Sequence, residues 1–260
     1  MLAIASIGLV AGFLSGLLGI GGGIIVTPLL LYMPQLVGAS TLSIRTVAGL
    51  TIVQGLLASL VGAISHRRFK FSSGRLAAYM GATIFVAAFL GGAGSKLVSN
   101  TVLLVLFLAL ACAGGILILL PTKNEEEYPA GAALDFNPAR AVAVAAGVGL
   151  LGGMVGQGGS FILIPLMTWF VKVPTRIAIG SNLAVVLFSS AAGFLGKAFT
   201  GQIEWLLAVP LVLTVIPSAA LGSRVSRRLS VLTLRRTLAV VIGVAVVRIA
   251  VSLLSGEVAG

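Results

Sequence analysis

The chain has 260 residues, of which 58% are hydrophobic and only 9% are charged, whereas a soluble domain carries about 25% charged residues. This composition excludes an ordinary soluble protein. The net charge of +11 would suggest a nucleic-acid partner in a soluble chain. Here the Lys and Arg residues gather in short loops between apolar runs, as in membrane proteins, so no nucleic-acid partner is expected.

The apolar runs predict an all-α, polytopic integral membrane protein. A helix needs about 20 apolar residues to cross the hydrocarbon core of a bilayer. Uncharged runs of this order recur along the chain, for example at 76–95, 98–120 and 141–170. The chain is therefore expected to lie in a lipid bilayer.

The first half of the chain opens with a short apolar segment that leads into "GIGGGIIVTP", residues 19 to 28. Glycine and proline weaken or break helices, and a bilayer penalises a broken backbone more than water does. The stretch therefore predicts two short helical segments interrupted at the glycines. Three longer spans follow, at about 41–65, 75–93 and 99–120.

The second half repeats this plan. The stretch "GQGGSFILIP" at 156–165 matches the first glycine motif at an offset of 137 residues (156 − 19 = 137), and "RIAIGSN" at 176–182 matches "RTVAGLT" at 45–51. A series of matches in the same order indicates a duplicated unit. Its long spans are expected at 176–199, 203–220 and 232–255. The predicted organisation is a first transmembrane repeat at 1–120, a polar cytoplasmic linker at 121–138 and a second repeat at 139–260.

Charge predicts that the two repeats have opposite orientations. The loop after the first long span is basic in half one, whereas the equivalent loop of half two holds Lys197 offset by Glu204. The next loop holds only Lys96 in half one but is rich in arginine in half two. Equivalent loops thus prefer opposite sides of the membrane, which indicates inverted topology. Whether each glycine-containing pair is re-entrant or makes two short crossings stays open.

Inverted repeats with interrupted helices are typical of secondary transporters, whose substrate site lies between the repeats. A helix that begins inside the membrane has unpaired N–H groups and a partial positive charge at that end, so it can bind an anion. Glycine lets the anion approach the backbone closely. The other spaced glycines, Gly12, Gly16, Gly149 and Gly153, are assigned to helix packing. The helix starts predicted to bind substrate are Gly21, Gly22 and Gly23 in half one, and Gly158, Gly159 and Ser160 in half two.

Polar residues near the start of the first long span of each repeat complete the predicted site. Arg45 and Arg176 stand at equivalent positions and would draw anions inward, although an arginine near a helix end can also extend to the interface. Further hydrogen-bond donors are Thr51, Ser181 and Asn182, with Gln54 and Gln157 as additional candidates.

The positions of the acidic residues indicate the charge of the substrate. None of the six falls in the middle of an apolar span, although intramembrane carboxylates are the usual carriers of protons and cations. An anionic substrate is therefore favoured, with sodium held by backbone carbonyls as an open possibility. No metal site, no cofactor and no enzymatic activity are expected. The chain lacks a phosphate-binding G-x-x-x-x-G-K-[ST] motif and a zinc H-E-x-x-H motif.

The paired stretches "GLVAGFLSGLLGIGGGIIVTPLL" and "GVGLLGGMVGQGGSFILIPLM", followed by "AGLT" and "GSNLAVVLFSSAAG", resemble the sulfite exporter TauE/SafE family over nearly the whole chain. The resemblance implies a multi-pass protein of the bacterial cytoplasmic membrane. It also implies export of a small sulfur-containing anion such as sulfite or sulfoacetate. Uptake of thiosulfate or sulfate is the alternative, and an intramembrane enzyme or a scaffold without transport activity are further ones. The sequence gives no indication of oligomeric state.

Overall fold

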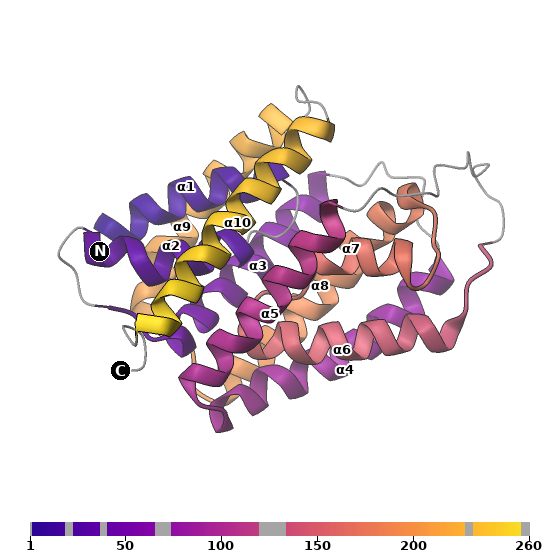
Figure 1. The fold of residues 1–260 in the computed structure, drawn as a ribbon, viewed down its shortest axis with the longest axis horizontal. Coiled ribbons are helices and arrows are strands. Elements are labelled where there is room, and N and C mark those ends of the chain that lie inside the picture. Colours follow the sequence, from indigo (N-terminus) through magenta and orange to yellow (C-terminus); the bar gives the residue numbers. More distant parts are fainter. Residues whose placement is uncertain are drawn as a thin grey trace.

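The structure is a computed structural model that describes residues 2–18, 23–36, 41–65, 74–119, 134–226 and 231–255. All regular structure in these residues is helical (Figure 1). The helices are α1 (Leu2–Leu18), α2 (Gly23–Leu36), α3 (Ile44–Ser65), α4 (Gly74–Gly94), α5 (Asn100–Leu119), α6 (Pro138–Val155), α7 (Ser160–Trp169), α8 (Thr175–Phe199), α9 (Trp205–Ser226) and α10 (Val231–Ser255), with a 3-10 turn η1 (Ser95–Leu97) after α4.

The helices lie where the apolar runs predict them. The three long spans of half one correspond to α3, α4 and α5, and those of half two correspond to α8, α9 and α10. The expected interruption of half two falls at its glycine motif, between α6 and α7. In half one, residues 19–22 lie outside the described residues. The start of α6 is fixed locally, because the Asn137 side chain accepts hydrogen bonds from the backbone N–H groups of Ala139 and Arg140 at 3.0 and 3.2 Å.

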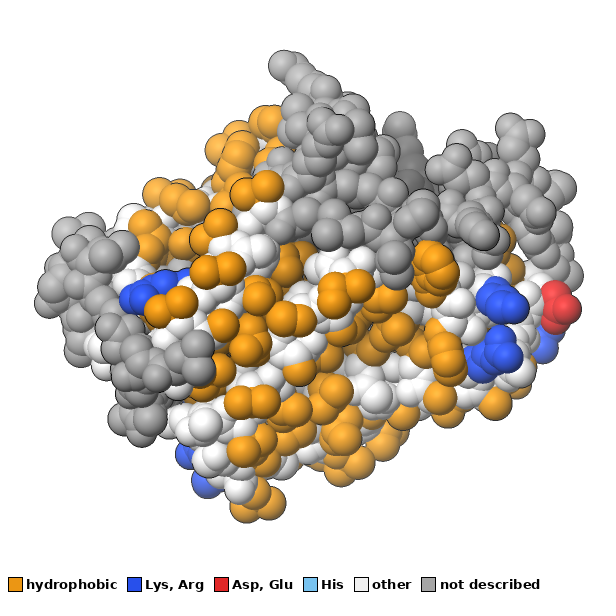
Figure 2. All heavy atoms as spheres, viewed as in Figure 1, with side chains coloured by type: hydrophobic (Ala, Val, Ile, Leu, Met, Phe, Trp, Pro, Cys, Tyr) orange, Lys and Arg blue, Asp and Glu red, His pale blue; other side chains and the backbone are white. Residues whose placement is uncertain are grey.

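The outer surface suits a bilayer. Helices α4, α5, α6 and α9 are long and apolar enough to cross a membrane, and shorter apolar helices lie beside them. Figure 2 shows hydrophobic side chains over the middle of one face, with Lys and Arg toward its two ends. Large side chains such as Val86, Leu206 and Leu213 are exposed, as expected where lipid replaces water. The class predicted from composition, an all-helical polytopic membrane protein, is confirmed.

Helices far apart in sequence pack closely through glycine. Helix α1 lies along α9, and α6 lies along α4 (Figure 1). A Cβ atom on Gly16 would lie 2.8 Å from the Ala219 Cα, and one on Gly153 would lie 2.9 Å from the Ala88 Cα. No side chain fits at either contact, so the packing role predicted for these glycines is confirmed. The glycines one turn earlier, Gly12 and Gly149, lie equally close to α9 and α4.

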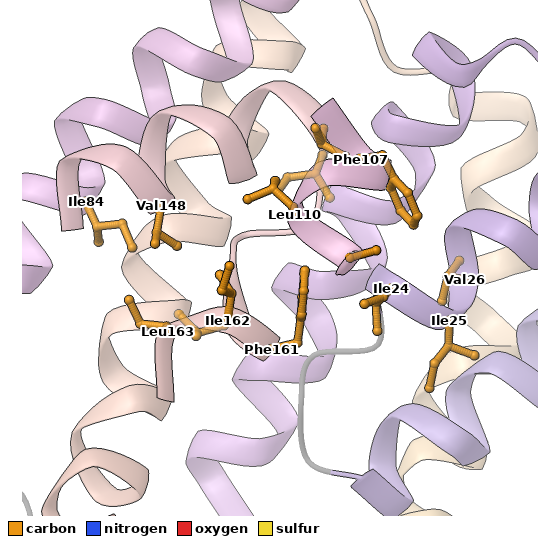
Figure 3. Close-up of a cluster of buried hydrophobic side chains, with 14 of the residues drawn as sticks. Ile24, Ile25, Val26, Ile84, Phe107, Leu110, Val148, Phe161, Ile162 and Leu163 are labelled. Atoms are coloured by element: carbon orange, nitrogen blue, oxygen red, sulfur yellow. The ribbon is translucent and has the colours of Figure 1, made fainter. Parts of the chain in front are cut away.

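Helices α6 and α7 form a hairpin inside the molecule. In Figure 1, α6 enters from the right, the chain turns in the interior, and α7 returns toward the same end. Helices α1 and α2 lie at the opposite end of the molecule. Figure 3 shows that the first turns of α2 and α7 point side chains into one apolar cluster with α5. Its labelled members from these helices are Ile24, Ile25, Val26, Phe107, Leu110, Phe161, Ile162 and Leu163.

Candidate functional site

The turn between α6 and α7 depends on glycine. Gly156, Gly158 and Gly159 have φ angles of 80°, 63° and 70°, a region that other residues reach only with strain. The carbonyl of Gly152 closes α6 by accepting hydrogen bonds from the N–H groups of Gln157 and Gly158, at 2.9 and 3.3 Å. The glycine cluster therefore stops one helix and starts the next within four residues.

The start of α7 faces this buried turn. The N–H groups of Ile162 and Leu163 donate to the Gly159 carbonyl at 3.2 and 3.1 Å. The N–H groups of residues 160 and 161 precede the first intrahelical hydrogen bonds and have no partner inside the helix. Gly158 and Gly159 are buried. The positive end of the α7 dipole thus lies in the interior, where it attracts negative charge.

The start of α2 lies against the same turn. Gly23 is the first residue of α2 and is buried. A Cβ atom on Gly23 would lie 3.0 Å from the Gln157 Cα and 3.1 Å from the Gln157 Cβ. The beginnings of two interrupted helices, one from each half of the chain, therefore meet. Gly21 and Gly22, which belong to the predicted site, lie outside the described residues.

Buried polar atoms without hydrogen-bond partners gather on the helices around this turn. Neither amide atom of Gln157 has a partner among the described residues, although Gln157 is only 3% exposed. The Ser190 hydroxyl, also without a partner, lies next to Gly158. Leaving a buried polar group unpaired costs about 1–3 kcal/mol. A cluster of such groups is expected where a polar ligand binds and supplies the missing partners. Further unpaired atoms are Thr27 Oγ1, Gln54 Oε1, Asn182 Oδ1 and Ser189 Oγ.

The structure places the predicted donors on α3 and α8. Ser181 and Asn182 are buried on α8. Thr51 is buried on α3, and its hydroxyl donates to carbonyls of its own helix, that of Val47 at 2.9 Å and that of Ala48 at 3.2 Å. In this conformation the Thr51 hydroxyl is available as an acceptor rather than as a donor.

The two predicted arginines both lie in the first turn of their helices. Arg45 is the second residue of α3, is half-buried, and donates from Nη2 to the Val98 carbonyl at 2.8 Å. Its Nε is buried without a partner. Arg176 is the second residue of α8. The side chains of Arg176 and of Ser160, the first residue of α7, lie outside the described part of the chain.

Sequence reasoning missed three buried residues of α8: Ser189, Ser190 and Lys197. The two serines follow Asn182 by seven and eight residues, which is two helical turns, so they share its face; this spacing was available as a signal. Lys197 was assigned to a loop, balanced by Glu204. That assignment is wrong, because Lys197 lies in the last turn of α8 and is completely buried, while Glu204 is exposed.

Apolar helices long enough to span a membrane, interrupted helices that meet in the interior and unpaired polar side chains around them are features of membrane transporters. The chain matches the family described as sulfite exporter TauE/SafE over residues 4–249, and it belongs to that family.

Several curated relatives match the chain over most of their own length and have names of one type. A Xylella fastidiosa protein named "Probable membrane transporter protein" is 30% identical, and the match covers 88% of this chain and 86% of that protein. "Probable membrane transporter protein YunE" of Bacillus subtilis is 23% identical, with 88% and 89% covered. A Methanocaldococcus jannaschii protein with the same type of name is 22% identical, with 92% and 91% covered. No solved structure matches the chain.

Proposed function

We propose that this transporter carries small sulfur-containing anions, such as sulfite or an organosulfonate like sulfoacetate, out of the cell across the bacterial cytoplasmic membrane. One observation carries the proposal: the starts of α2 and α7 meet at a buried glycine turn whose neighbouring polar side chains lack partners. Two helix N-termini together form an environment for an anion. The amide of Gln157 and the hydroxyl of Ser190 supply hydrogen-bond donors to the oxygens of a sulfite or sulfonate group.

The distribution of charge supports an anion rather than a cation. In the part of the chain that the structure describes, the acidic residues are Asp135 and Glu204, and both are exposed. A buried cation would need carboxylates or a set of carbonyl ligands. Arginine, hydroxyl and amide groups instead lie on the interior sides of α3 and α8.

Packing between equivalent helices supports the inverted repeat that alternating access requires. A Cβ atom on Gly222 of α9 would lie 2.9 Å from the Phe13 carbonyl carbon in α1. A Cβ atom on Gly91 of α4 would lie 2.9 Å from the Leu150 carbonyl carbon in α6. The two pairs are related by offsets of 131 and 137 residues (222 − 91 = 131; 150 − 13 = 137), the same offsets at which Arg45 matches Arg176 and Gly19 matches Gly156. We infer that the α1–α9 and α6–α4 pairs are two copies of one unit, related by inversion.

The proposed roles of the site residues follow from their positions. The glycines let an oxyanion reach backbone N–H groups, the arginines attract it, and Ser181 and Asn182 donate to its oxygens. Thr51 adds a donor when its hydroxyl rotates away from the Val47 carbonyl. The set consists of Gly21, Gly22, Gly23, Arg45, Thr51, Gly158, Gly159, Ser160, Arg176, Ser181 and Asn182.

The test is the flux of labelled sulfite, sulfoacetate and thiosulfate in proteoliposomes. We expect Arg45→Ala, Arg176→Ala and the double variant Ser181→Ala/Asn182→Ala each to reduce flux by about tenfold or more, because each removes a hydrogen bond to a charged group. Arg75→Ala is the matched control, since Arg75 is exposed at the start of α4. Unchanged flux in all three variants would show that these residues are structural. Flux of thiosulfate but not of sulfite or sulfoacetate would favour uptake of a different oxyanion.

A further inference from the structure

Lys197 is a buried cation whose described hydrogen-bond partners are all uncharged. Its ammonium group donates to the Ser95 hydroxyl at 2.7 Å, to the Met154 carbonyl at 3.1 Å and to the Gln202 side-chain oxygen at 3.5 Å. Ser95 follows α4, Met154 is near the end of α6, and Gln202 follows α8. Lys197 therefore connects three separate segments, and it has no negative partner among them.

A second cation lies nearby. Arg45 donates to the Val98 carbonyl, the Val98 N–H donates to the Ser95 carbonyl, and the hydroxyl of Ser95 accepts from Lys197, so the two cations flank one short segment. The start of α3, which carries Arg45, also packs against Gln202, a hydrogen-bond partner of Lys197. The contact is made by Gly49, one turn after Arg45, which lies against the Gln202 carbonyl. The carboxylates in the described part of the chain, those of Asp135 and Glu204, are both exposed. A buried charge without a counterion is costly, and here two like charges share one region.

This cationic cluster lies close to the glycine turn. Met154 precedes Gly156 by two residues, and Ser190, which contacts Gly158, precedes Lys197 by seven residues on α8. Seven residues are two helical turns, or about 10 Å. Ser190 and Lys197 thus share one face of α8, so an anion leaving the turn along this face would meet Lys197 next.

We propose that Lys197 forms a second oxyanion-binding site beside Arg45, which takes the substrate after it leaves the glycine turns or before it reaches them. The inference rests on the proposed function and adds a second position on the path of the anion. In the conformation described, oxygens of Ser95, Met154 and Gln202 occupy the places around the ammonium group that oxygens of the anion take when it binds. The ligand is a small oxyanion, with sulfite, sulfate and thiosulfate as probes.

A purely structural role for Lys197 makes a different prediction. A lysine near the carboxyl end of α6 stabilises that end through the helix dipole. In that case the loss of Lys197 would lower the unfolding temperature and leave anion affinity unchanged. Removing one of its internal acceptors would likewise leave affinity unchanged.

The experiment measures the affinity of the purified full-length chain in detergent for sulfite, sulfate and thiosulfate, by calorimetry and by the anion-dependent rise in unfolding temperature. We expect Lys197→Met and Arg45→Gln to weaken binding by about tenfold or more, because each removes a charged donor. Lys197→Arg should retain most of the affinity. Lys96→Met is the matched control, since Lys96 is adjacent to Ser95 but exposed.

Ser95→Ala keeps the proposal testable if variants at Lys197 fail to fold. It removes an acceptor that competes with the anion for the ammonium group, so we expect affinity to rise about threefold. Absence of anion binding by the wild type, or wild-type affinity in Ser95→Ala, would overturn the second site. If proteoliposomes carry no sulfur anion but Lys197→Met still loses anion binding, the site stands and the proposed transport function fails. Normal flux of the wild type with unchanged affinity in Lys197→Met and Ser95→Ala removes only the second site.

Discussion

The backbone of Gly158 lies directly against the side chain of Ser190: a Cβ atom on Gly158 would fall 2.7 Å from the serine hydroxyl oxygen. Gly158 also has a φ angle of 63°. We expect Gly158→Ala to cost about 1–2 kcal/mol of stability from backbone strain and to reduce anion flux more strongly, because the methyl group displaces a proposed substrate ligand. Thermal unfolding and proteoliposome flux measure the two effects.

The control for this variant is Gly147→Ala in α6, because a Cβ atom on Gly147 meets no atom within 4 Å. Gly147→Ala should have wild-type flux and equal or slightly higher stability. Equal flux in Gly158→Ala and Gly147→Ala would contradict the role given to the glycine turn.

A substitution at Gln157 should affect stability and transport in opposite directions. Its amide is buried without partners, so Gln157→Leu replaces an unpaired polar group by an apolar one of similar size. We expect stability to stay the same or to rise by about 1 kcal/mol, while flux falls about tenfold because the anion loses a donor. Thr168→Val in α7 is the control, since the Thr168 hydroxyl bonds only to the Pro165 carbonyl in its own helix. Wild-type flux in Gln157→Leu would remove Gln157 from the site.

The packing glycines should behave as a matched pair. Replacing glycine by alanine within a helix normally stabilises it by about 0.5–1 kcal/mol. At Gly16 and Gly153 the added methyl group would collide with the backbone of a neighbouring helix, so we expect both variants to be destabilised, by about 1–3 kcal/mol.

Gly243→Ala in α10 provides the comparison for this pair, because it meets no atom within 4 Å and should be neutral or stabilising. Unfolding temperatures in detergent test the three variants together. A destabilised Gly16→Ala beside a stabilised Gly153→Ala would argue that the two helix pairs are not equivalent.

Membrane potential should drive the proposed export. Moving one negative charge out of a negative-inside compartment gains about 2.3 kcal/mol per 100 mV, so sulfite efflux from proteoliposomes should accelerate when a negative-inside potassium diffusion potential is imposed. Reversing the potential should slow efflux. Flux that is the same at both potentials would indicate electroneutral exchange or a coupling ion.

Local sequence was sufficient to locate the glycine turn between α6 and α7. Gly158 and Gly159 were recognisable because clustered glycines before a proline in an apolar run mark a helix break, and that break is where α6 ends and α7 begins. The burial of Lys197 could not be recognised from the sequence. Its burial depends on Ser95 and Met154, which are 102 and 43 residues away in sequence, so counting charges in loops misplaced it.

The sequence by itself determined the helices, their breaks and the membrane environment, because helix formation and transfer into lipid depend on runs of neighbouring residues. Only the tertiary structure decided which helices pack together and which polar groups are buried. Most of these helices carry apolar residues around their whole circumference, so a hydrophobic face in the sequence does not indicate a partner. The contacts of α1 with α9, of Gly23 with Gln157 and of Lys197 with Ser95 each join residues that are distant in the chain.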